Sequence, residues 1–435
     1  MGWAMYHEIL ASGLIMRTLQ SEADQAAFVA FNARFNNITE GATCQCLVRH
    51  HPQMDNDHFF IVEDERHNQV VACLCLIPWE LHFEGISLKA AMMEMVLSHP
   101  DYRRLGLVKK LIRKFQEEVG IHGFDLTLIT GIPNYYRQFG YSYALDLGES
   151  VNLSVEMIPE AAGNASFFSG ISFRAASIPD IPFLHELHVH SMNSLQLFFG
   201  RDEAYWRYLL QGARFDIRML DDAMTGKTLG YAILKQEGGV LSVMESGIRS
   251  DVENKTWDKD VAGTLLRCLA KEGRRGIRIY AHPHDKVWQV AMEWGAAVLN
   301  NNQWLLKVED QVALLSKLVP AFERRIGKSS MPGLTTEVVV NQFRQAIGIS
   351  IVCGKIMGIR SLGFVDSSMG ADGGDLCIPP DAFLRLLFGY RSLEQLWDAW
   401  PDTVVRESSR EMLGILFPKM DAHLLGIYHY QGEIG

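Results

Sequence analysis

The stretch of sequence that decides the fold is VLSHPDYRRLGLVKKLI, residues Val96–Ile112. An apolar strand pattern ends at Ser98, a turn carrying two arginines and a glycine follows, and amphipathic helical spacing begins near Val108. Backbone N–H groups at a helix N-terminus bind anions, and a glycine lets the anion come close to the backbone. Flanking arginines add charge-assisted hydrogen bonds. The stretch therefore predicts a strand, turn and helix that hold a pyrophosphate.

Strands and one helix surround this stretch. Residues 58–81 read as two strands joined by a charged turn at Asp64–Asn68, and Ala91–Ser98 reads as a third strand. Apolar residues at helical spacing predict a helix that ends at Gly120. The unit is completed by a strand, a short segment and a further strand at Phe124–Thr130, Tyr135–Phe139 and Tyr141–Leu147. This order predicts an α/β unit.

A similar order of elements recurs between about Ile171 and Val308. The expected strands and helices of this second copy are Asp216–Leu220, Leu229–Leu234, Val240–Ser246, Lys259–Glu272, Ile277–Ala281 and Val287–Trp294. Where the first copy has RRLGLV, the second has RSDVENK at Arg249–Lys255, with two carboxylates and no glycine. These charges repel phosphate, so we expect no cofactor in the second copy.

The last part of the chain does not repeat the order of elements seen in the two copies. Pro379 and Pro380 mark a helix start and Gly389 its end, and the segments SLEQLWDAW and SSREMLGILFP predict two further helices. Apolar residues at helical spacing in the first of these helices indicate a core more than a lipid pocket. We expect three domains, at 1–165, 166–315 and 316–435, the third of α+β type.

Composition excludes several classes of partner. The 435 residues include 41 basic and 51 acidic ones, a net charge of −10 that repels a phosphate backbone. No run reaches the roughly 18–20 apolar residues of a membrane span, and the N-terminus lacks the pattern of a signal peptide. We expect a cytoplasmic protein that binds neither nucleic acid nor a membrane.

Cysteine and histidine groupings raise the question of a metal. Two Cys-x-Cys pairs, at 44/46 and 73/75, have enough thiols for a zinc site, but the second lies in the apolar run VVACLCLIPW. Small buried side chains are the favoured interpretation. The cluster of His50, His51 and His58 matches no zinc spacing and is interpreted as a solvated loop. We assign no metal.

Two motifs carry a resemblance to a known family. Arg103-x-x-Gly106-x-Val108 resembles the acetyl-CoA motif R/Q-x-x-G-x-G/A of the GNAT N-acetyltransferases, with Val108 in place of the last small residue. Together with YRQFGY at Tyr136–Tyr141, it resembles the branch typified by the enhanced intracellular survival protein of mycobacteria. That resemblance implies tandem GNAT folds, each a mixed central sheet with flanking helices, and a C-terminal domain similar to sterol carrier proteins.

The resemblance also implies a site for the co-substrate acetyl-CoA. The strand end would meet the acetyl and pantetheine groups, the turn and helix start the pyrophosphate, and the end of the next strand the pantetheine arm: Val96, Leu97, Ser98, Arg103, Arg104, Leu105, Gly106, Leu107, Val108, Lys109, Gly131 and Ile132. Tyr136 falls on the family's general acid. A tyrosine hydroxyl beside the sulfur suits protonation of the departing thiolate, although a packing role is the alternative for Tyr136.

Two groups are candidates for the general base. In the branch, the C-terminal carboxylate, here that of Gly435, takes the proton of the amine, and the tail resembles the family through LFPK and IYHY. Residues Gln431–Gly435 extend beyond the family pattern, so Glu94 is the substitute candidate. Alternation along a strand places Glu94 on the face of Val96 and Ser98. An ion-paired strand residue is the other interpretation of Glu94.

The sequence thus predicts an acetyl-CoA-dependent N-acetyltransferase acting on a primary amine of a small cationic molecule, with aminoglycosides as one option. A non-catalytic acyl-CoA or lipid binding protein is one alternative, and an acetyltransferase of protein lysines or N-termini is another. The resemblance further implies a homo-oligomer, with a hexamer as one form.

Overall fold

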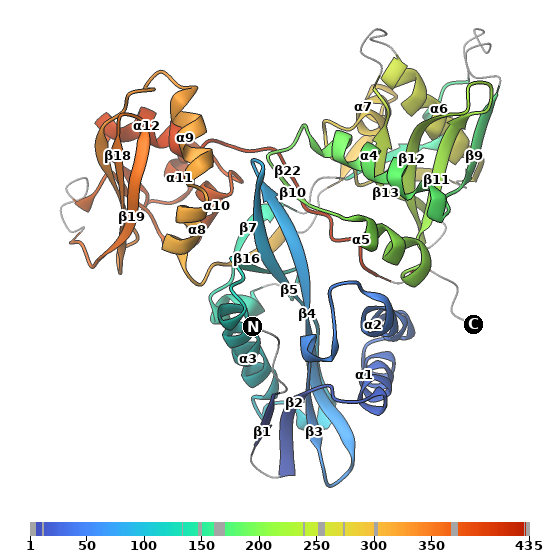
Figure 1. Cartoon of the computed structure of the whole chain (residues 1–435), viewed down its shortest axis with the longest axis horizontal. Coiled ribbons are helices and arrows are strands. Elements are labelled where there is room, and N and C mark those ends of the chain that lie inside the picture. The colour runs from blue at the N-terminus through green and yellow to red at the C-terminus, as the bar shows by residue number, and fades with distance from the viewer. Residues whose placement is uncertain are drawn as a thin grey trace.

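The computed structural model describes residues 6–10, 13–132, 134–146, 150–160, 170–237, 240–250, 257–272, 275–299, 303–366, 373–429 and 431. Three sheets organise these residues, with ten, seven and five strands. Figure 1 shows three parts, in which the long β4–β5 hairpin of the first rises between the other two. The expected mixed α/β class is confirmed.

The first sheet contains the strands predicted around Val96–Ile112. Its order is β1 (His7–Ile9), β2 (Leu14–Thr18), β3 (Phe59–Asp64), β4 (Gln69–Phe83), β5 (Ile86–Ser98), β6 (Leu126–Ile129), β16 (Gln303–Lys307) and β7 (Ser142–Asp146). Neighbours pair antiparallel except β5 and β6, which are parallel. Strand β10 (Leu197–Phe199) joins the edge of β4, and β22 (Ala422–His423) pairs with β10.

Helices cover both faces of this sheet. Helix α3 (Leu107–Ile121) packs on one face against Leu74 and Leu76 of β4. Helices α1 (Glu22–Phe35) and α2 (Ile38–His50) pack on the other, in the cluster that contains Cys73 and Cys75. A strand buried on both faces is apolar throughout instead of alternating, which explains the run VVACLCLIPW.

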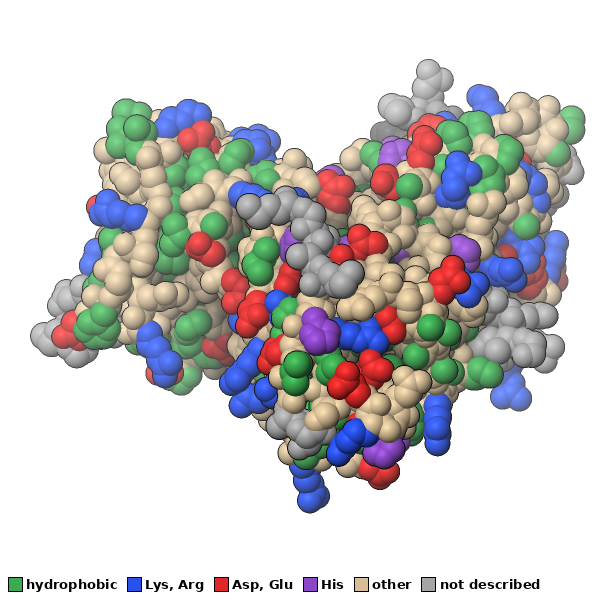
Figure 2. Space-filling model, turned by 60° about the horizontal axis from the view of Figure 1, so that its bottom comes forward, with side chains coloured by type: hydrophobic (Ala, Val, Ile, Leu, Met, Phe, Trp, Pro, Cys, Tyr) green, Lys and Arg blue, Asp and Glu red, His purple; other side chains and the backbone are tan. Residues whose placement is uncertain are grey.

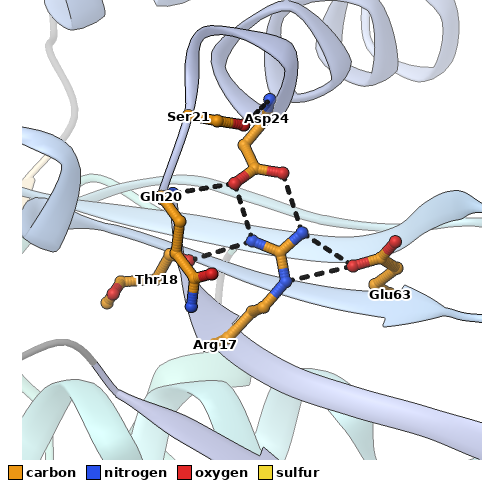
Figure 3. A network of polar contacts seen from close by, with 6 residues as sticks. All are labelled: Arg17, Thr18, Gln20, Ser21, Asp24 and Glu63. Carbon is orange, nitrogen blue, oxygen red and sulfur yellow. Dashed lines mark hydrogen bonds and ion pairs between the residues drawn. The ribbon is translucent and has the colours of Figure 1, made fainter.

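Arg17 of β2 fixes the start of α1, as Figure 3 shows. Its guanidinium donates to both carboxylate oxygens of Asp24 at 2.8 and 2.9 Å and to Glu63 of β3 at 2.7 and 3.0 Å. Asp24 also accepts from the backbone N–H of Gln20 at 2.7 Å, and Ser21 caps the helix by accepting from the Asp24 N–H. One cation thereby joins two strands and a helix.

The second sheet has the order β15 (Ala297–Leu299), β8 (Ser150–Ser154), β14 (Gly276–Ile279), β13 (Val240–Ile248), β12 (Lys227–Glu237), β11 (Asp216–Asp222) and β9 (Ile171–Ala175). Its helices include α4 (Ile181–Met192), α5 (Glu203–Arg207), the short π-helix η8 (Tyr208–Gly212), α6 (Trp257–Glu272) and α7 (Lys286–Glu293). Strand β8 comes from the end of the first unit, while β16 of the second unit lies in the first sheet. The two units therefore exchange a strand, and the division of the chain at residues 165 and 315 stays a prediction.

The third sheet has the order β19 (Lys355–Gly363), β18 (Ala346–Val352), β17 (Thr336–Asn341), β20 (Leu376–Cys377) and β21 (Val404–Val405). Its helices are α8 (Gln311–Lys317), α9 (Val319–Gly327), α10 (Pro380–Leu387), α11 (Leu393–Ala399) and α12 (Arg410–Leu416). The apolar side chains of α10 are buried in the core, as expected. Arg325 of α9 donates to Glu84 at the tip of the β4–β5 hairpin at 2.9 Å, which joins this part to the first sheet.

The strands and helices predicted in both units are present, whereas α1 and α2 were not predicted. The interpretation of the histidine cluster as a solvated loop is wrong for His51 and His58, which are buried, whereas His50 is exposed. The ring of His51 lies edge-on to Tyr205 and Tyr208 of the second unit, at 5.5 and 5.1 Å between ring centroids. Burial lowers the pKa of His51 to about 3, so this histidine is neutral and acts in packing.

Charges of both signs are interspersed on the molecular face shown in Figure 2, and among its described residues no broad basic surface appears. This distribution agrees with the net charge of −10. No helix in the described part of the chain combines the length and the apolar character that crossing a membrane requires.

Candidate active site

Strands β5 and β6 separate at the place where the sequence predicts the site. Their parallel pairing joins Ala90–Met92 to Leu126–Leu128 and stops there. Just beyond, β5 bulges: Glu94 pairs with Cys75 and Leu97 with Cys73, so two residues of β5 lie opposite one of β4. Met95 in the bulge has a φ of 55°, in the left-handed region. The bulge bends β5 away from β6 and leaves a strand edge for backbone hydrogen bonds to an extended ligand.

The bulge also interrupts the alternation of side chains that was expected along β5. An extra residue shifts every later side chain to the opposite face of a strand. Glu94 and Leu97 therefore share the face of α1 and α2, together with their partners Cys75 and Cys73. Ser98 lies opposite Ala72 on the face of α3. The expectation that Glu94 shares a face with Val96 and Ser98 is wrong, because Val96 also packs on the α3 face.

A pocket of about 270 Å³ lies on the α3 side of the strand end. It is lined by Ser98, Tyr102, Arg103, Arg104, Gly106, Leu107, Val108, Lys109 and Tyr135. Gly106 is the N-cap residue of α3 with a φ of 75°, and no side chain caps the helix start. The side chains of Arg103, Arg104 and Lys109 are exposed at its rim, whereas that of Leu107 is buried, so Leu107 offers only its backbone. The pocket has the donors and the charge that an anion requires.

The remaining predicted binding residues lie outside this pocket. Val96 packs against the core under α3, and Leu97 is partly buried on the opposite face. Leu105 and Ile132 are exposed, at 57% and 68%. Gly131 lies two residues beyond the end of β6 at Ile129. The pocket also gains Tyr102 and Tyr135, which sequence reasoning missed, although Tyr135 stands next to the YRQFGY motif.

Tyr136 packs directly on Gly131. It belongs to the short 3-10 helix η4 (Tyr135–Phe139), and its side chain is only 4% exposed. A Cβ atom on Gly131 would overlap the Tyr136 ring, so the glycine provides the space that the ring occupies. Burial, followed by the negative charge of Glu94, raises the pKa of Tyr136 above its usual value. The hydroxyl therefore keeps its proton at neutral pH.

Glu94 is partly buried at the bulge. Burial raises the pKa of its carboxyl group to about 7, and a hydrogen bond from Tyr428 opposes this rise. The Glu40 carboxylate of α2 raises the pKa of Glu94 further, because the two groups carry the same charge. Among the described residues, no cation forms an ion pair with Glu94, so its interpretation as an ion-paired strand residue is not supported. A carboxyl group that titrates near neutral pH suits a general base.

Tyr428, which lowers the pKa of Glu94, belongs to the last part of the chain, which Figure 1 shows in red crossing to β22. Three side chains donate hydrogen bonds to backbone carbonyls of this segment: Trp304 to Leu424 at 2.7 Å, Tyr205 to Ile427 at 2.9 Å and Tyr208 to Tyr428 at 2.5 Å. Sequence reasoning missed Tyr428, although it lies within the IYHY motif. Gly435, the other candidate base, lies outside the described residues.

Comparison with known proteins agrees with this geometry. Residues 16–144 match the acetyltransferase (GNAT) domain family. No curated protein matches the sequence. Among solved structures, the GCN5-related N-acetyltransferases of Anabaena variabilis and Kribbella flavida have TM-scores of 0.67 and 0.62 at 14% and 17% identity, and each comparison covers 95% of this chain and 99% of the other. Eis1 of Mycobacterium abscessus has a TM-score of 0.57 at 12% identity, covering 94% of this chain and 97% of the other.

At these identities the structural likenesses establish the fold alone. The family match concerns residues 16–144, the part of the chain that carries β3 to β6, the anion pocket and Tyr136.

Proposed function

We propose that the chain is an acetyl-CoA-dependent N-acetyltransferase that acts on a primary amine of a small cationic molecule. One observation carries the proposal: Glu94 and Tyr136 lie where the pairing of β5 and β6 ends, beside an anion pocket, and the negative charge of Glu94 acts on Tyr136. Glu94 lies on the α1/α2 face of the sheet, whereas Tyr136 and the pocket lie on the α3 face.

The residues where this pairing ends fit acetyl-CoA, the acyl donor of GNAT acetyltransferases. Arg103, Arg104 and the N–H groups at the start of α3 would hold the pyrophosphate. The edge of Val96–Ser98 would bind the pantetheine arm through its backbone, with Gly131 and Ile132 along the end of β6. Acetyl-CoA supplies an acetyl group on a thioester, and the other steps belong to the protein.

The two side chains then divide the proton transfers between them. Glu94 accepts the proton of the ammonium substrate, which frees the nitrogen lone pair to form the new bond with the acetyl carbon. The carbon–sulfur bond breaks, and Tyr136 gives its proton to the departing sulfur. The nitrogen loses its second proton as the amide forms, and that proton restores the Tyr136 hydroxyl. A carboxyl group with a pKa of about 7 is a base near neutral pH, and a tyrosine with a raised pKa is still protonated there.

The surroundings of Glu94 favour a cationic acceptor. Glu40 and Glu94 both stand on the face from which the acceptor would enter. Carboxylates in a partly desolvated cleft attract an amine-bearing molecule. We therefore propose polyamines and aminoglycosides as the first acceptors to test, with lysine peptides as the rival class.

The resemblance adds further proposals to this one. They are a sterol-carrier-like third domain, a homo-oligomer, a cytoplasmic location and a second unit that binds no cofactor. Of the second-unit segment that would repel phosphate, residues 251–255 lie outside the described part of the chain.

Replacing Tyr136 with phenylalanine tests the proposed function. Tyr136→Phe is expected to lower kcat by about 10²–10⁴, because general acid catalysis contributes that much. Thiol release from acetyl-CoA is measured across amines and peptides, and acetyl-CoA affinity by calorimetry, with Tyr280→Phe in the second unit as control. The affinity should stay within about twofold of the wild type. Acetyl-CoA binding without thiol release from any acceptor would favour the binding-protein alternative.

The anion pocket is tested by Arg103→Ala combined with Arg104→Ala. We expect acetyl-CoA to bind about 10–100-fold more weakly, because charge-assisted hydrogen bonds to phosphate contribute about 1.5–3 kcal/mol in all. Acetyl-pantetheine, which lacks the pyrophosphate, should bind as before. Arg113→Ala, at an exposed position of the same helix, is the matched control. Equal weakening of both thioesters would place the pyrophosphate elsewhere.

A further inference from the structure

Helix α10 of the third part of the chain lies against the last strand of the first sheet. This strand is β7, and Figure 1 shows α10 beside it. Arg385 of α10 donates a hydrogen bond from Nε to the backbone carbonyl of Tyr143 in β7 at 2.6 Å. One turn earlier, the Asp381 carboxylate lies 3.9 Å from the guanidinium of Arg137, which belongs to η4. Residues four apart share a face of a helix, so one face of α10 contacts both β7 and η4.

The side chain of Tyr143 connects this contact to η4, the 3-10 helix that carries Tyr136. The Tyr143 hydroxyl accepts a hydrogen bond from the backbone N–H of Asn134 at 3.3 Å. Asn134 is the N-cap residue of η4, its φ is 65°, and no side chain caps the helix start. The internal hydrogen bonds of a short 3-10 helix have poor geometry, so its position depends on contacts from outside. Tyr143 therefore joins the start of η4 to the strand that Arg385 holds.

A cavity of about 300 Å³ lies at this junction of η4, β7 and α10. Its lining includes Arg137 and Gly140 from η4 and its C-cap, Ser142 from β7 and Asp381 from α10. A void supplies no atoms that resist a shift of the helix, so close packing does not fix η4 on this side. On the side of α3, Gln116 donates to the Phe139 carbonyl at 3.0 Å. The polar contacts across the junction thus hold η4 from the side that packing leaves open.

Arg385 itself is an unusual residue for its place in α10. The apolar residues before and after it in the helix are buried. Its guanidinium lies over the Trp400 ring at 4.4 Å, and its Nη1 nitrogen is buried with no hydrogen-bond partner in the described part of the chain. A buried charged nitrogen without a partner is unfavourable for folding. The third part therefore gains little stability from this arginine, whose short hydrogen bond reaches the first sheet.

We infer that Arg385 is a positioning residue for the reaction: by holding Tyr143 it fixes η4, and with it the Tyr136 hydroxyl that protonates the departing sulfur. The inference rests on the proposed function, in which Tyr136 is the acid. It gives the third part of the chain a role in turnover that is exerted through α10.

The main test compares Arg385→Met with the wild type in thiol release from acetyl-CoA. Displacing a catalytic group by about 1 Å costs about 10²-fold in rate, so we expect kcat to fall by about 10–100-fold. Acetyl-CoA affinity, measured by calorimetry, should stay within about threefold, because Arg103, Arg104 and the start of α3 are unchanged. Arg385→Lys keeps a donor and a charge at this position and should recover part of the loss.

Arg410→Met is the matched control, because Arg410 lies over the Trp397 ring at 4.3 Å, a similar contact within the third part. Its kcat and acetyl-CoA affinity should equal those of the wild type. An unchanged kcat in Arg385→Met, or an equal loss in Arg410→Met, overturns the inference.

A second measurement needs no acceptor amine. Hydrogen exchange of the backbone amides of residues 134–141 is followed by mass spectrometry on the full chain. Loss of a hydrogen bond from a charged group should speed this exchange about tenfold in Arg385→Met and leave it unchanged in Arg410→Met. Equal exchange in Arg385→Met and the wild type overturns the inference. If no acceptor ever releases thiol, the proposed function fails, while the exchange still decides whether α10 holds η4.

Tyr143→Phe covers a failure of Arg385→Met to fold. This variant removes one partly buried hydroxyl and leaves the backbone carbonyl that Arg385 binds. Because a neutral hydrogen bond is weaker, kcat should fall by about 2–10-fold at unchanged acetyl-CoA affinity, and exchange at residues 134–141 should rise. A wild-type kcat together with wild-type exchange contradicts the inference.

Discussion

Gly131→Ala is expected to lower turnover about a hundredfold or more, although it adds a single methyl group outside the anion pocket. The new Cβ would occupy the space of the Tyr136 ring, so the ring has to move. Displacing a catalytic group by about 1 Å costs about 10²-fold in rate. The backbone at Gly131 is not in the left-handed region, so the expected effect is steric. Steady-state thiol release measures it.

Two further variants separate this mechanism from general damage. Gly120→Ala, at a glycine of α3 with open space around its Cβ position, should leave turnover within about twofold of the wild type. Combining Gly131→Ala with Tyr136→Phe should cost little more than Tyr136→Phe alone, because both changes remove the same group. Losses that multiply in the double variant would show that Gly131 acts independently of Tyr136.

Arg201→Met is expected to lower the free energy of unfolding by about 3–5 kcal/mol, the usual cost of leaving a buried charge unpaired. Arg201 donates to both oxygens of Glu245 at 2.8 and 3.0 Å, and both side chains are buried in the second unit. The Tyr231 hydroxyl donates to the same carboxylate at 2.7 Å, and the His188 ring lies 3.4 Å from it. Burial lowers the pKa of His188, so neither neighbour replaces the cation. Urea denaturation of the full chain, followed by circular dichroism, measures the change.

The control for this prediction is the exposed ion pair of Arg360 and Glu337. Arg360→Met should change the free energy of unfolding by no more than about 0.5 kcal/mol, because exposed pairs contribute little. Removing both buried charges with Arg201→Met and Glu245→Leu should recover part of the loss, since no uncompensated charge is left. A double variant less stable than Arg201→Met alone would contradict this account.

The sequence predicts those elements whose periodicity is strong. Strands β4 and β5 and helix α3 follow directly from apolar runs and helical spacing. Helix α1 was missed because it buries only Phe28, Phe31 and Asn32, too few residues for a clear apolar stripe. Its N-cap Ser21 was the available signal, since Ser followed by an acidic first turn is typical of a helix start.

Other features have no local signal. The bulge at Met95 depends on how β5 pairs with β4, and this pairing decides which face Glu94 occupies. The effect of Tyr428 on the pKa of Glu94 joins residues that are far apart in the sequence, and Tyr208 of the second unit holds the backbone of Tyr428 in place. Periodicity describes one element at a time, so it identifies Glu94 and the IYHY motif separately without bringing them together.

The strand exchange between the two sheets sets the order in which the protein is completed during synthesis. Strand β16 lies between β6 and β7, although it follows them by more than 150 residues in the chain. The first sheet cannot close until Lys307 has left the ribosome, so until then β6 and β7 each present an open edge in a chain that already carries every residue of the anion pocket and Tyr136. Open strand edges invite pairing with other chains. Completion of the catalytic sheet therefore depends on translation of the second unit, and a ribosome that stalls before Gln303 leaves an aggregation-prone chain in place of a small working enzyme.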